Sequence, residues 1–311
     1  MTANRLLPAL GVLLLVIAGG ALWWARTERP PPPPPVVDAG QPVAPDKPVP
    51  TVTVAKAEGK VAVRRQGKDQ WEEVTVGAVL AEDDTVRTGA GATVELEAGG
   101  NTVTLLAGTD VKVAELTADL TRYLLGAGLI EGAAPGSAGR TLQVDVEGTD
   151  VAVRASGGSF RMSSNGAGTV AVAAQQGDVR VAARGKEVVL KQGERSLVLP
   201  GGSPSDPAPL ATSLLLKVAW PKQRETNKRS VTITGRTEAG ALVFALGRPV
   251  KVGPDGAFHE TISLPEGETQ LKVAAVDVSG NDQREVGPKI LVDSRGASSH
   301  FKTDDLWKKQ P

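Results

Sequence analysis

Few residues of this 311-residue chain have the types and spacing that metal-dependent or nucleophilic chemistry requires. The sequence has no cysteine, and its two histidines, His259 and His300, stand far apart and have no plausible metal-ligating neighbour in the sequence. A His/Cys metal cluster is therefore impossible. His259 falls on an expected strand, where we expect its side chain to point outward, and His300 falls in the C-terminal tail.

Enzyme motifs are also missing, because the sequence contains no G-x-S-x-G elbow, no P-loop and no glycine-rich dinucleotide fingerprint. We therefore expect a protein that is not an enzyme, with no catalytic, cofactor-binding or metal-binding residues and no cofactor. The sequence does not identify its ligand-binding residues. A glycan-active enzyme is the least favoured alternative, which stays open because catalytic carboxylate pairs are spaced in three dimensions rather than along the chain.

Two local features have competing interpretations. Asp277, Asn281 and Asp282 could supply oxygen ligands to Ca²⁺, although their spacing is not that of an EF-hand; we favour a carboxylate that bonds to the backbone of a turn. Trp220, just before Pro221 at an expected strand end, could stack on a sugar, but we favour a residue that closes the edge of a sandwich. Asp304-Asp305 is a further acidic pair, in the tail.

The N-terminal region contains an apolar run, residues 6–24, that is long enough to cross a bilayer. The paired Trp23 and Trp24 suit the headgroup region, so we expect a single transmembrane anchor preceded by a short cytoplasmic N-terminus, residues 1–5. The alternative is a cleavable secretory signal, because Gly19 and Ala21 are small enough for a peptidase site. Both interpretations export the rest of the chain.

Residues 25–50 follow the anchor and include an unbroken proline run, Pro30 to Pro35. Such a run favours an extended polyproline II conformation and cannot join the interior of a helix or sheet. We therefore expect a proline-rich stalk. A docking site for a proline-reading domain is the alternative.

Composition limits what the exported part can be. Lys and Arg number 35 and Asp and Glu number 35, so the formal net charge is zero and no global field attracts nucleic acid. Without cysteine there is no disulfide framework, and stability must come from core burial. Aromatic residues make up 3% of the chain and glycine occurs 36 times, a combination that predicts many short strands joined by glycine turns.

From Thr51 onward, apolar and polar residues alternate as they do in half-buried strands, for example at Val52 and Val54, at Val61 and Val63, and at Val74 and Val76. This pattern continues through Val113 and resumes from Leu142 to Val198. Between them, Leu116 to Arg140 is less regular, and we expect a loop at Gly132 to Gly139. The periodicity predicts an all-β fold.

Short segments recur along this region. Gly-Thr-Asp-Val occurs at Gly108 to Val111 and at Gly148 to Val151, and Gly-x-Val-x-Val occurs at Gly59 to Val63 and at Gly177 to Val181. The recurrence either marks a duplicated or pseudo-symmetric β module or reflects turns that reuse the same residues before strands.

Two blocks carry a family resemblance. Gly59 to Val113 has the order G-x-V, tryptophan, V-x-x-G-x-x-L, D-x-V-R-T-G and V-x-L, and Val144 to Glu194 continues it. Residues 51–199 thus resemble the FecR domain family, which implies a FecR-like β-sandwich or jelly-roll-type domain. Trp71 then takes the place of a strand aromatic, expected to be in the core or half-buried, and Glu82-Asp83-Asp84 is an ordinary acidic turn. Glu147 departs from the arginine usual in the family.

The FecR resemblance implies a periplasmic domain and so an N-terminus inside. The best-known members relay a signal to a sigma factor through a cytoplasmic N-terminal domain. Five residues cannot form such a domain, so we expect no direct sigma-factor binding, unless a partner reads the helix within the membrane, where Gly19-Gly20-Ala21 would permit close helix approach.

A second linker, residues 200–212, contains Gly201 to Pro209 (GGSPSDPAP), which we expect to join neither neighbouring sheet. Residues 213–293 have strands at regular spacing, beginning with Leu214 to Trp220, and their V-x-I-x-G-x-T segment and Asp255 to Phe258 turn resemble bacterial immunoglobulin-like domains typified by the glucodextranase B module. The resemblance implies an accessory β-sandwich. The tail, residues 294–311, is expected to be flexible, and its Phe301 and Leu306 to Lys309 form either a frayed end or a short partner motif.

These features together predict a single-pass protein of the bacterial inner membrane with its C-terminal domains in the periplasm. The favoured function is that of a non-enzymatic binding or scaffold protein of the cell envelope, with peptidoglycan, another glycan or an envelope protein as partner. One alternative is a FecR-type signalling component that acts through the transmembrane helix. Another is an accessory protein for glycan-active machinery.

Overall fold

The computed structural model describes residues 50–294. The expected anchor at residues 6–24, nearly all of the expected stalk and nearly all of the expected tail lie outside these residues, as do His300, Phe301, Asp304 and Trp307. Over residues 50–294 the fold is all-β, with one short 3₁₀ helix, η1 (Gly136–Ala138). No helix in this part of the chain has the length and hydropathy to cross a bilayer.

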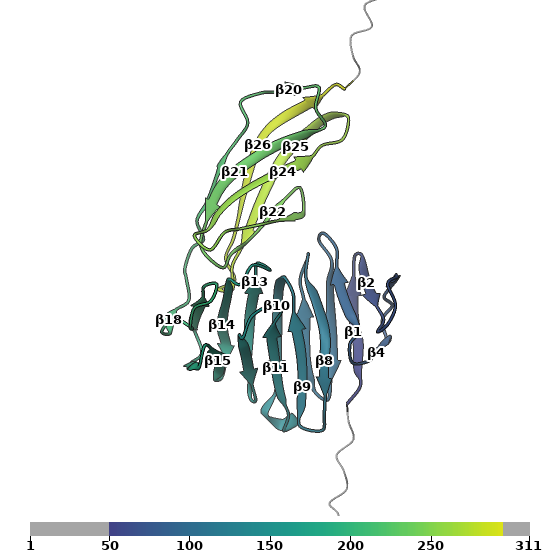
Figure 1. Ribbon diagram of the computed structural model, residues 1–311, viewed down its shortest axis with the longest axis vertical. Coiled ribbons are helices and arrows are strands. Elements are labelled where there is room, and N and C mark those ends of the chain that lie inside the picture. Colours follow the sequence, from purple (N-terminus) through teal and green to yellow (C-terminus); the bar gives the residue numbers. More distant parts are fainter. Residues whose placement is uncertain (1–49, 295–311) are drawn as a thin grey trace, which may run out of the picture. The chain divides into compact units, whose positions relative to one another are not determined.

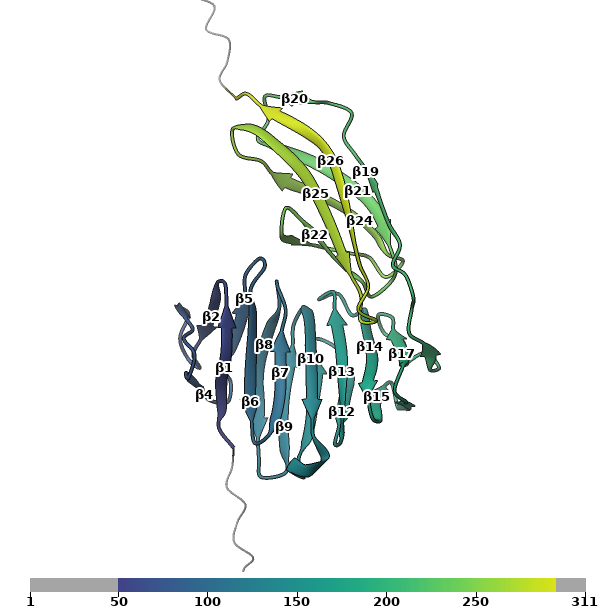
Figure 2. The ribbon, with the colours of Figure 1, turned by 180° about the vertical axis from the view of Figure 1, so that it is seen from behind.

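The first domain is a sandwich of two nine-stranded sheets, called here sheet A and sheet B, and its strands appear from opposite sides in Figure 1 and Figure 2. In spatial order, sheet A consists of β18 (Ala208–Pro209), β17 (Glu194–Val198), β14 (Val170–Gln176), β13 (Gly158–Ser164), β10 (Gly128–Ala134), β7 (Asn101–Leu105), β6 (Thr93–Ala98), β1 (Val52–Glu58) and β4 (Val79–Leu80).

Sheet B consists, in spatial order, of β16 (Lys186–Leu190), β15 (Val179–Ala183), β12 (Ala152–Ala155), β11 (Thr141–Val146), β9 (Leu120–Leu125), β8 (Asp110–Leu116), β5 (Thr85–Thr88), β2 (Val61–Arg64) and β3 (Trp71–Glu73). The chain passes through β10 of sheet A between β9 and β11, which pair in parallel. The other strand pairs of sheet B are antiparallel.

Alternation along the strands builds the core of this domain, because every second side chain points between the sheets. Val52 and Val54 of β1 and Val61 and Val63 of β2 are at most 2% exposed, as the periodicity predicted. Tyr123 and Phe160 are the largest fully buried side chains. Each buried Val or Leu stabilises the fold by about 1.5–3 kcal/mol relative to an exposed one, so the core offsets the absence of disulfides.

The second domain comprises a three-stranded and a five-stranded sheet around its own core. The three-stranded sheet has β19 (Leu216–Ala219), β21 (Ser230–Thr237) and β24 (Ala257–Ser263), and the five-stranded sheet has β20 (Glu225–Thr226), β26 (Asp282–Val292), β25 (Gly267–Val276), β22 (Leu242–Ala245) and β23 (Arg248–Val250). The expected turn at Asp255 to Phe258 contains Gly256 with positive φ, and the turns at Gly240, Gly267 and Gly280 also contain a glycine with positive φ, which glycine adopts without steric cost.

One strand prediction in the first domain was wrong, and one loop prediction was wrong for its first residues. Val74 and Val76 do not lie on one strand, because β3 ends at Glu73 and the chain turns at Gly77, whose φ is +85°; Val76 is 61% exposed. The expected loop at Gly132 to Gly139 begins inside β10. Its glycine content reflects close packing, since a Cβ on Gly132 would lie 2.6 Å from Cζ of Phe160.

The expectation that Gly201 to Pro209 joins neither sheet was also wrong. Ala208 and Pro209 form β18, which pairs with Arg195 and Glu194 of β17 at the edge of sheet A. Proline is tolerated at such an edge because no further strand requires its missing N–H group. The sheet of the first domain therefore extends into the segment that composition assigned to a linker.

Candidate functional site

The two ends of sheet B have the same strand connectivity. At one end, β1 of sheet A leads into the β2–β3 hairpin of sheet B and then into β4, which returns to pair with β1. At the other end, β14 leads into the β15–β16 hairpin and then into β17, which returns to pair with β14. Next inward lie β5 and β8 at the first end, and β12 and β11 at the second.

This connectivity decides which sequence recurrence is structural. Gly59 to Val63 leads into β2 and Gly177 to Val181 leads into β15, so the two Gly-x-Val-x-Val segments occupy equivalent places. Gly108 to Val111 leads into β8, whereas Gly148 to Val151 leads into β12, which corresponds to β5. The first recurrence therefore follows the pseudo-symmetry of the sheet, and the second reuses turn residues.

The strand register extends the equivalence to single residues. Ala62 of β2 lies opposite Arg87 of β5, and Arg180 of β15 lies opposite Arg154 of β12. One strand further inward, Arg87 lies opposite Asp110 of β8, and Arg154 lies opposite Gln143 of β11. Arg154 thus corresponds to Arg87, Gln143 to Asp110, and Arg180 to Ala62. We call the two sets of residues the Asp110 corner (Ala62, Arg64, Trp71, Arg87, Asp110) and the Gln143 corner (Gln143, Arg154, Arg180, Glu187).

In the Asp110 corner, the arginines are paired within the protein. Nε and Nη2 of Arg87 donate to the two carboxylate oxygens of Asp110, at 2.6 and 3.0 Å. The guanidinium carbons of Arg87 and Arg64 lie 4.4 and 5.3 Å from the ring centroid of Trp71, within reach of a cation–π interaction. The hydrogen bond with Asp110 raises the pKa of Arg87. Trp71 is half-buried, as the sequence predicted.

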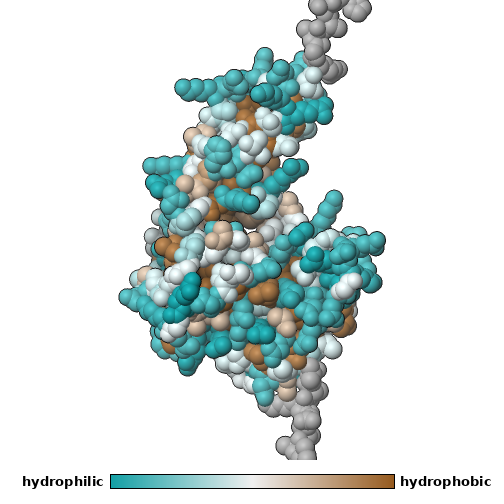
Figure 3. Space-filling view, in the orientation of Figure 1, coloured by the Kyte–Doolittle hydropathy of each residue, from teal (hydrophilic) through white to brown (hydrophobic). Residues whose placement is uncertain are grey.

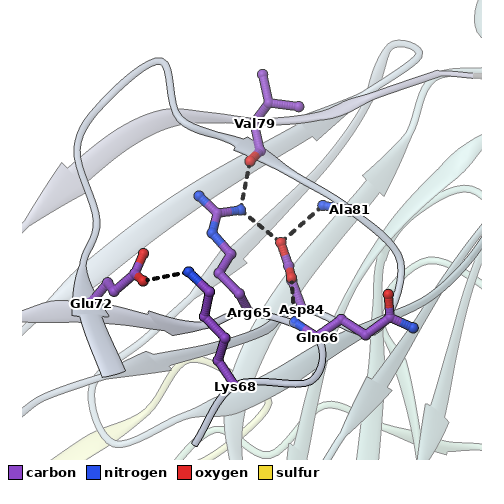
Figure 4. A network of polar contacts seen from close by, with 7 residues as sticks. All are labelled: Arg65, Gln66, Lys68, Glu72, Val79, Ala81 and Asp84. Atoms are coloured by element: carbon purple, nitrogen blue, oxygen red, sulfur yellow. Dashed lines mark hydrogen bonds and ion pairs between the residues drawn. The ribbon is translucent and has the colours of Figure 1, made fainter. Parts of the chain in front are cut away.

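Arg65, which follows Arg64 of this corner in the sequence, forms a partly buried ion pair with Asp84, drawn in Figure 4. Asp84 is 2% exposed and accepts from Nη1 of Arg65 at 2.7 Å, and from the backbone N–H groups of Gln66 and Ala81, both at 3.0 Å. Burial raises the pKa of Asp84, but the two backbone donors and Arg65 outweigh it, so the pKa lies below its ordinary value. The last residue of the acidic turn Glu82-Asp83-Asp84 is therefore a structural acceptor.

In the Gln143 corner, the equivalent arginine has no carboxylate partner. Nε of Arg154 donates to Oε1 of Gln143 at 2.8 Å, and within residues 50–294 no hydrogen bond or ion pair engages its terminal nitrogens. Gln143 in turn donates to Asp145. Arg180, directly opposite Arg154, pairs with Glu187 at 3.0 Å through Nη1. Like charges directly opposite each other destabilise a sheet.

A pocket of about 390 Å³ lies over this corner. Its lining comprises Thr141, Arg154, Ser156, Gly157, Asp178 and Arg180. The hydroxyl oxygens of Thr141 and Ser156 are 3.1 Å apart, and Asp178 is ion-paired with Lys191. The pocket is thus lined by the terminal nitrogens of Arg154, which have no partner in the described residues, and by the hydroxyl groups of Thr141 and Ser156.

A row of polar side chains continues inward from the Gln143 corner, and Gln143 itself is only 8% exposed in it. The register places Arg180, Arg154, Gln143 and Arg122 opposite one another on β15, β12, β11 and β9. Arg122 pairs with Glu115 at 3.0 Å and with Asp145 at 3.7 Å. Three strand spacings of about 4.8 Å make this row about 14 Å long.

The other residues singled out by the sequence have structural positions. His259 is exposed on β24 opposite Thr234, as predicted. Trp220 packs against the core of the second domain, and a Cβ on Gly287 would collide with its indole ring. Trp220 therefore closes a sandwich edge.

The calcium interpretation does not fit the contacts of Asp277. Its Oδ1 accepts from the backbone N–H of Asn281 at 2.8 Å, and its Oδ2 accepts from Nδ2 of Asn281 at 2.9 Å. Asp282 pairs with Arg284 instead. Asp277 is thus a buried turn residue, as the favoured interpretation had it. Within residues 50–294, no group of three His, Asp or Glu side chains could hold a metal ion.

Gln143, Arg154 and Arg180 were not predicted from the sequence. The recurrence of Gly-x-Val-x-Val was the available signal, because aligning Val61 with Val179 also aligns Ala62 with Arg180. The equivalence of Arg154 and Arg87 required the strand register, which a four-residue recurrence does not contain.

Comparisons with known proteins give a match for the second domain. Residues 216–292 match the family glucodextranase, domain B. This match confirms the resemblance that the turn and strand residues carried there. It spans about a quarter of the chain, and no FecR family model matches residues 51–199, so the FecR resemblance stays a prediction. A search of the curated proteins found no match.

Solved structures show only distant similarity. Two crystal structures of a protein proposed to be an anti-sigma factor from Parabacteroides distasonis align at 20% and 21% identity, each with a TM-score of 0.34, over 39% of this chain. The aligned part spans 57% of that protein. Fibronectin(III)-like modules of Clostridium thermocellum CbhA align at 13% identity and a TM-score of 0.24, over 58% of this chain and 93% of theirs.

Proposed function

We propose that this chain is a membrane-anchored, non-enzymatic binding or scaffold protein of the bacterial cell envelope, with its two β domains in the periplasm and a glycan as its partner. The observation that carries this proposal is the row of Arg180, Arg154, Gln143 and Arg122 across four strands of sheet B. Arg180 and Arg154 are exposed, and exposed guanidinium groups can hold a ligand by hydrogen bonds. Figure 3 shows one face of the molecule, on which hydrophilic residues predominate and apolar residues are scattered.

The second domain supports a glycan rather than a protein partner. Its family is a domain of glucodextranase, an enzyme named for a polysaccharide. Domains of one fold serve many functions, so the match indicates a class of partner and not a substrate. The accessory role for glycan-active machinery is compatible with the same binding function.

Co-sedimentation with insoluble envelope glycan tests this proposal. The full-length protein in detergent is mixed with purified peptidoglycan sacculi and, separately, with immobilised envelope polysaccharide, and the bound fraction is measured. We expect at least one of these glycans to retain the protein. After the protein is removed, we expect the glycan to be chemically unchanged. Retention by neither would contradict the binding function, and the appearance of cleaved glycan would contradict a non-enzymatic one.

Membrane fractionation tests the proposed localisation. We expect the protein in the inner-membrane fraction with the run Leu6 to Trp24 retained, because Trp23, Trp24 and Arg26 suit the end of an anchor. N-terminal sequencing of the mature protein supplies the readout. A soluble protein that begins at Leu22 would contradict the anchor.

A helix exchange separates binding from FecR-type signalling, which the residue order of Gly59 to Val113 favours as a second candidate. Replacing Leu6 to Trp24 by an unrelated spanning helix should leave glycan retention unchanged, and the altered gene should complement a deletion strain as well as the wild-type gene does. Failure to complement with retained glycan binding would favour signalling through the membrane.

A further inference from the structure

We propose that the Gln143 corner binds the carboxylate of an acidic saccharide, with Arg154 as the principal contact. This inference rests on the proposed function, because it names the site and the ligand class by which the protein would hold an envelope glycan. Neither the resemblance to FecR domains nor the match to glucodextranase domain B assigns this corner a role.

The Asp110 corner provides the internal precedent. In the equivalent place of the fold, Arg87 engages both oxygens of the Asp110 carboxylate, which is the geometry that guanidinium groups prefer. At the Gln143 corner an amide replaces that carboxylate, and the terminal nitrogens of Arg154 have no partner within residues 50–294. Gln143 occupies Nε of Arg154, so a carboxylate from outside the protein would bind the two terminal nitrogens, whereas Asp110 binds Nε and Nη2 of Arg87.

Arg180 strengthens the case for an anionic ligand. It corresponds to Ala62, so a second positive charge stands directly opposite Arg154. Its pairing with Glu187 is solvent-exposed, with side chains 63% and 41% exposed, and such pairs contribute at most about 1 kcal/mol. A bound anion between the two guanidinium groups would offset their repulsion.

The surroundings favour a carboxylate over a phosphate group. Asp178 lines the same pocket, and Glu187 already takes one donor of Arg180. A phosphate monoester carries about 1.5 to 2 negative charges at neutral pH, and these two acids would repel it more than they repel a monoanion. A carboxylate carries a single negative charge, so Asp178 and Glu187 repel it less.

The remaining pocket groups favour a saccharide. The hydroxyls of Thr141 and Ser156 lie together beside the guanidinium groups, and each can donate to and accept from sugar hydroxyls. The pocket volume of about 390 Å³ falls within the range of small-ligand sites. The row continues from the pocket to Arg122, so further sugar units of a chain would pass over the buried Gln143 and meet the half-buried Arg122.

Calorimetric titration of the full-length protein tests the site. The probe is a trisaccharide of galacturonic acid, with a neutral trisaccharide, acetate and inorganic phosphate as comparison ligands. We expect binding of the uronate that weakens as salt rises, and no measurable binding of the neutral sugar. Acetate and phosphate should bind at least about tenfold more weakly than the uronate, because they lack its hydroxyls.

Three variants locate the binding. Arg154→Gln and Arg180→Ala should each weaken uronate binding at least about tenfold, since each removes a charged hydrogen-bonding partner. Arg87→Gln changes the equivalent arginine of the Asp110 corner and should change the affinity less than about twofold. Circular dichroism checks that each variant is folded, and all three positions are exposed.

Each result decides the proposal in one direction. Equal uronate affinity of the wild type and both corner variants would overturn the site, and equal affinity for acetate or phosphate would overturn the saccharide. If sacculi or polysaccharide still retain Arg154→Gln and Arg180→Ala as well as the wild type, the site is wrong while the binding function stands. If the trisaccharide binds at this corner but no envelope glycan is retained, the site stands and the proposed function fails.

Discussion

The two ends of sheet B share a connectivity and differ in how their arginines are satisfied. At the Asp110 corner, Arg87 has a carboxylate on one side and an indole ring on the other. At the Gln143 corner, Arg154 has an amide and faces a second arginine. Equivalent backbone positions thus carry an arginine paired with a carboxylate at one end and an arginine without a carboxylate partner at the other, which shows that sheet geometry alone does not determine how the arginines are paired.

The difference extends into the core. The pairing of β2 with β5 ends at Arg64 and Thr85, and that of β15 with β12 ends at Ala182 and Ala152. One residue further along each strand, Arg65 corresponds to Ala183, and Asp84 corresponds to Val151. Ala183 and Val151 are at most 3% exposed and belong to the apolar core, whereas Arg65 and Asp84 form an ion pair. The Asp110 corner is therefore stabilised partly by charges, and the Gln143 corner by apolar burial.

The largest expected effect is that of Asp84→Ala. This substitution removes the carboxylate that accepts hydrogen bonds from the Arg65 side chain and from two backbone N–H groups. Breaking a buried pair on one side costs about 3–5 kcal/mol. Because the Arg65 side chain is 30% exposed, we expect a loss of about 3 kcal/mol in the free energy of unfolding, measured by urea denaturation.

The matched control replaces both members of the pair by the residues of the other corner, as Arg65→Ala with Asp84→Val. Exchanging a whole buried pair for apolar side chains is often neutral. We expect the double variant to be more stable than Asp84→Ala alone. A double variant as unstable as the single one would show that the two corners cannot exchange their packing.

Acid should weaken the Asp110 corner selectively. The pKa of Asp84 is lowered in the folded protein, so its contribution to stability is complete above the unfolded value of about 3.9 and is lost as pH falls through the folded pKa. Between pH 7 and pH 3, the urea midpoint of the wild type should fall further than that of the Arg65→Ala/Asp84→Val variant. Equal falls would show that Asp84 is not a contributor.

Arg87→Gln should have a smaller effect on stability. The Arg87 and Asp110 side chains are 53% and 37% exposed, and exposed pairs contribute about 0.2–1 kcal/mol. We expect a loss of up to about 1 kcal/mol in urea denaturation together with a change in tryptophan fluorescence, because the cation next to Trp71 is removed. An unchanged emission spectrum would argue against the stacked geometry.

The smallest expected effect is a gain from Arg180→Ala. In the absence of ligand, this variant removes a like charge directly opposite Arg154, which should raise the free energy of unfolding by about 0.2–0.5 kcal/mol. The exposed pair with Glu187 offsets part of that gain. A clear loss of stability would mean that Arg180 serves the fold rather than a ligand.

Much of the fold follows from the sequence because strand periodicity and turn glycines are local signals. Val52 and Val54 are buried as their alternation predicts, and the turn at Gly256 has the positive φ that its Asp-Gly pair indicates. The failures have tertiary causes. Gly132 belongs to a strand because Phe160 packs over it, and Pro209 joins an edge strand because an edge position does not need its N–H group.

The candidate site could not be predicted from local sequence patterns. An exposed arginine on a strand is ordinary, and nothing in the neighbouring residues of Arg154 distinguishes it from Arg87. The distinction lies in which residue the register places opposite each arginine, Gln143 or Asp110, and register depends on pairing between distant parts of the chain. The alternation predicted the outward-facing side chains, but not their partners.

The most direct test of the account is a crystal structure of the protein with the galacturonic acid trisaccharide bound. We predict a carboxylate at the Gln143 corner with its two oxygens about 2.7–2.9 Å from the terminal nitrogens of Arg154, while Nε of Arg154 keeps its hydrogen bond to Gln143. A saccharide bound elsewhere, with the terminal nitrogens of Arg154 facing solvent, would contradict the account.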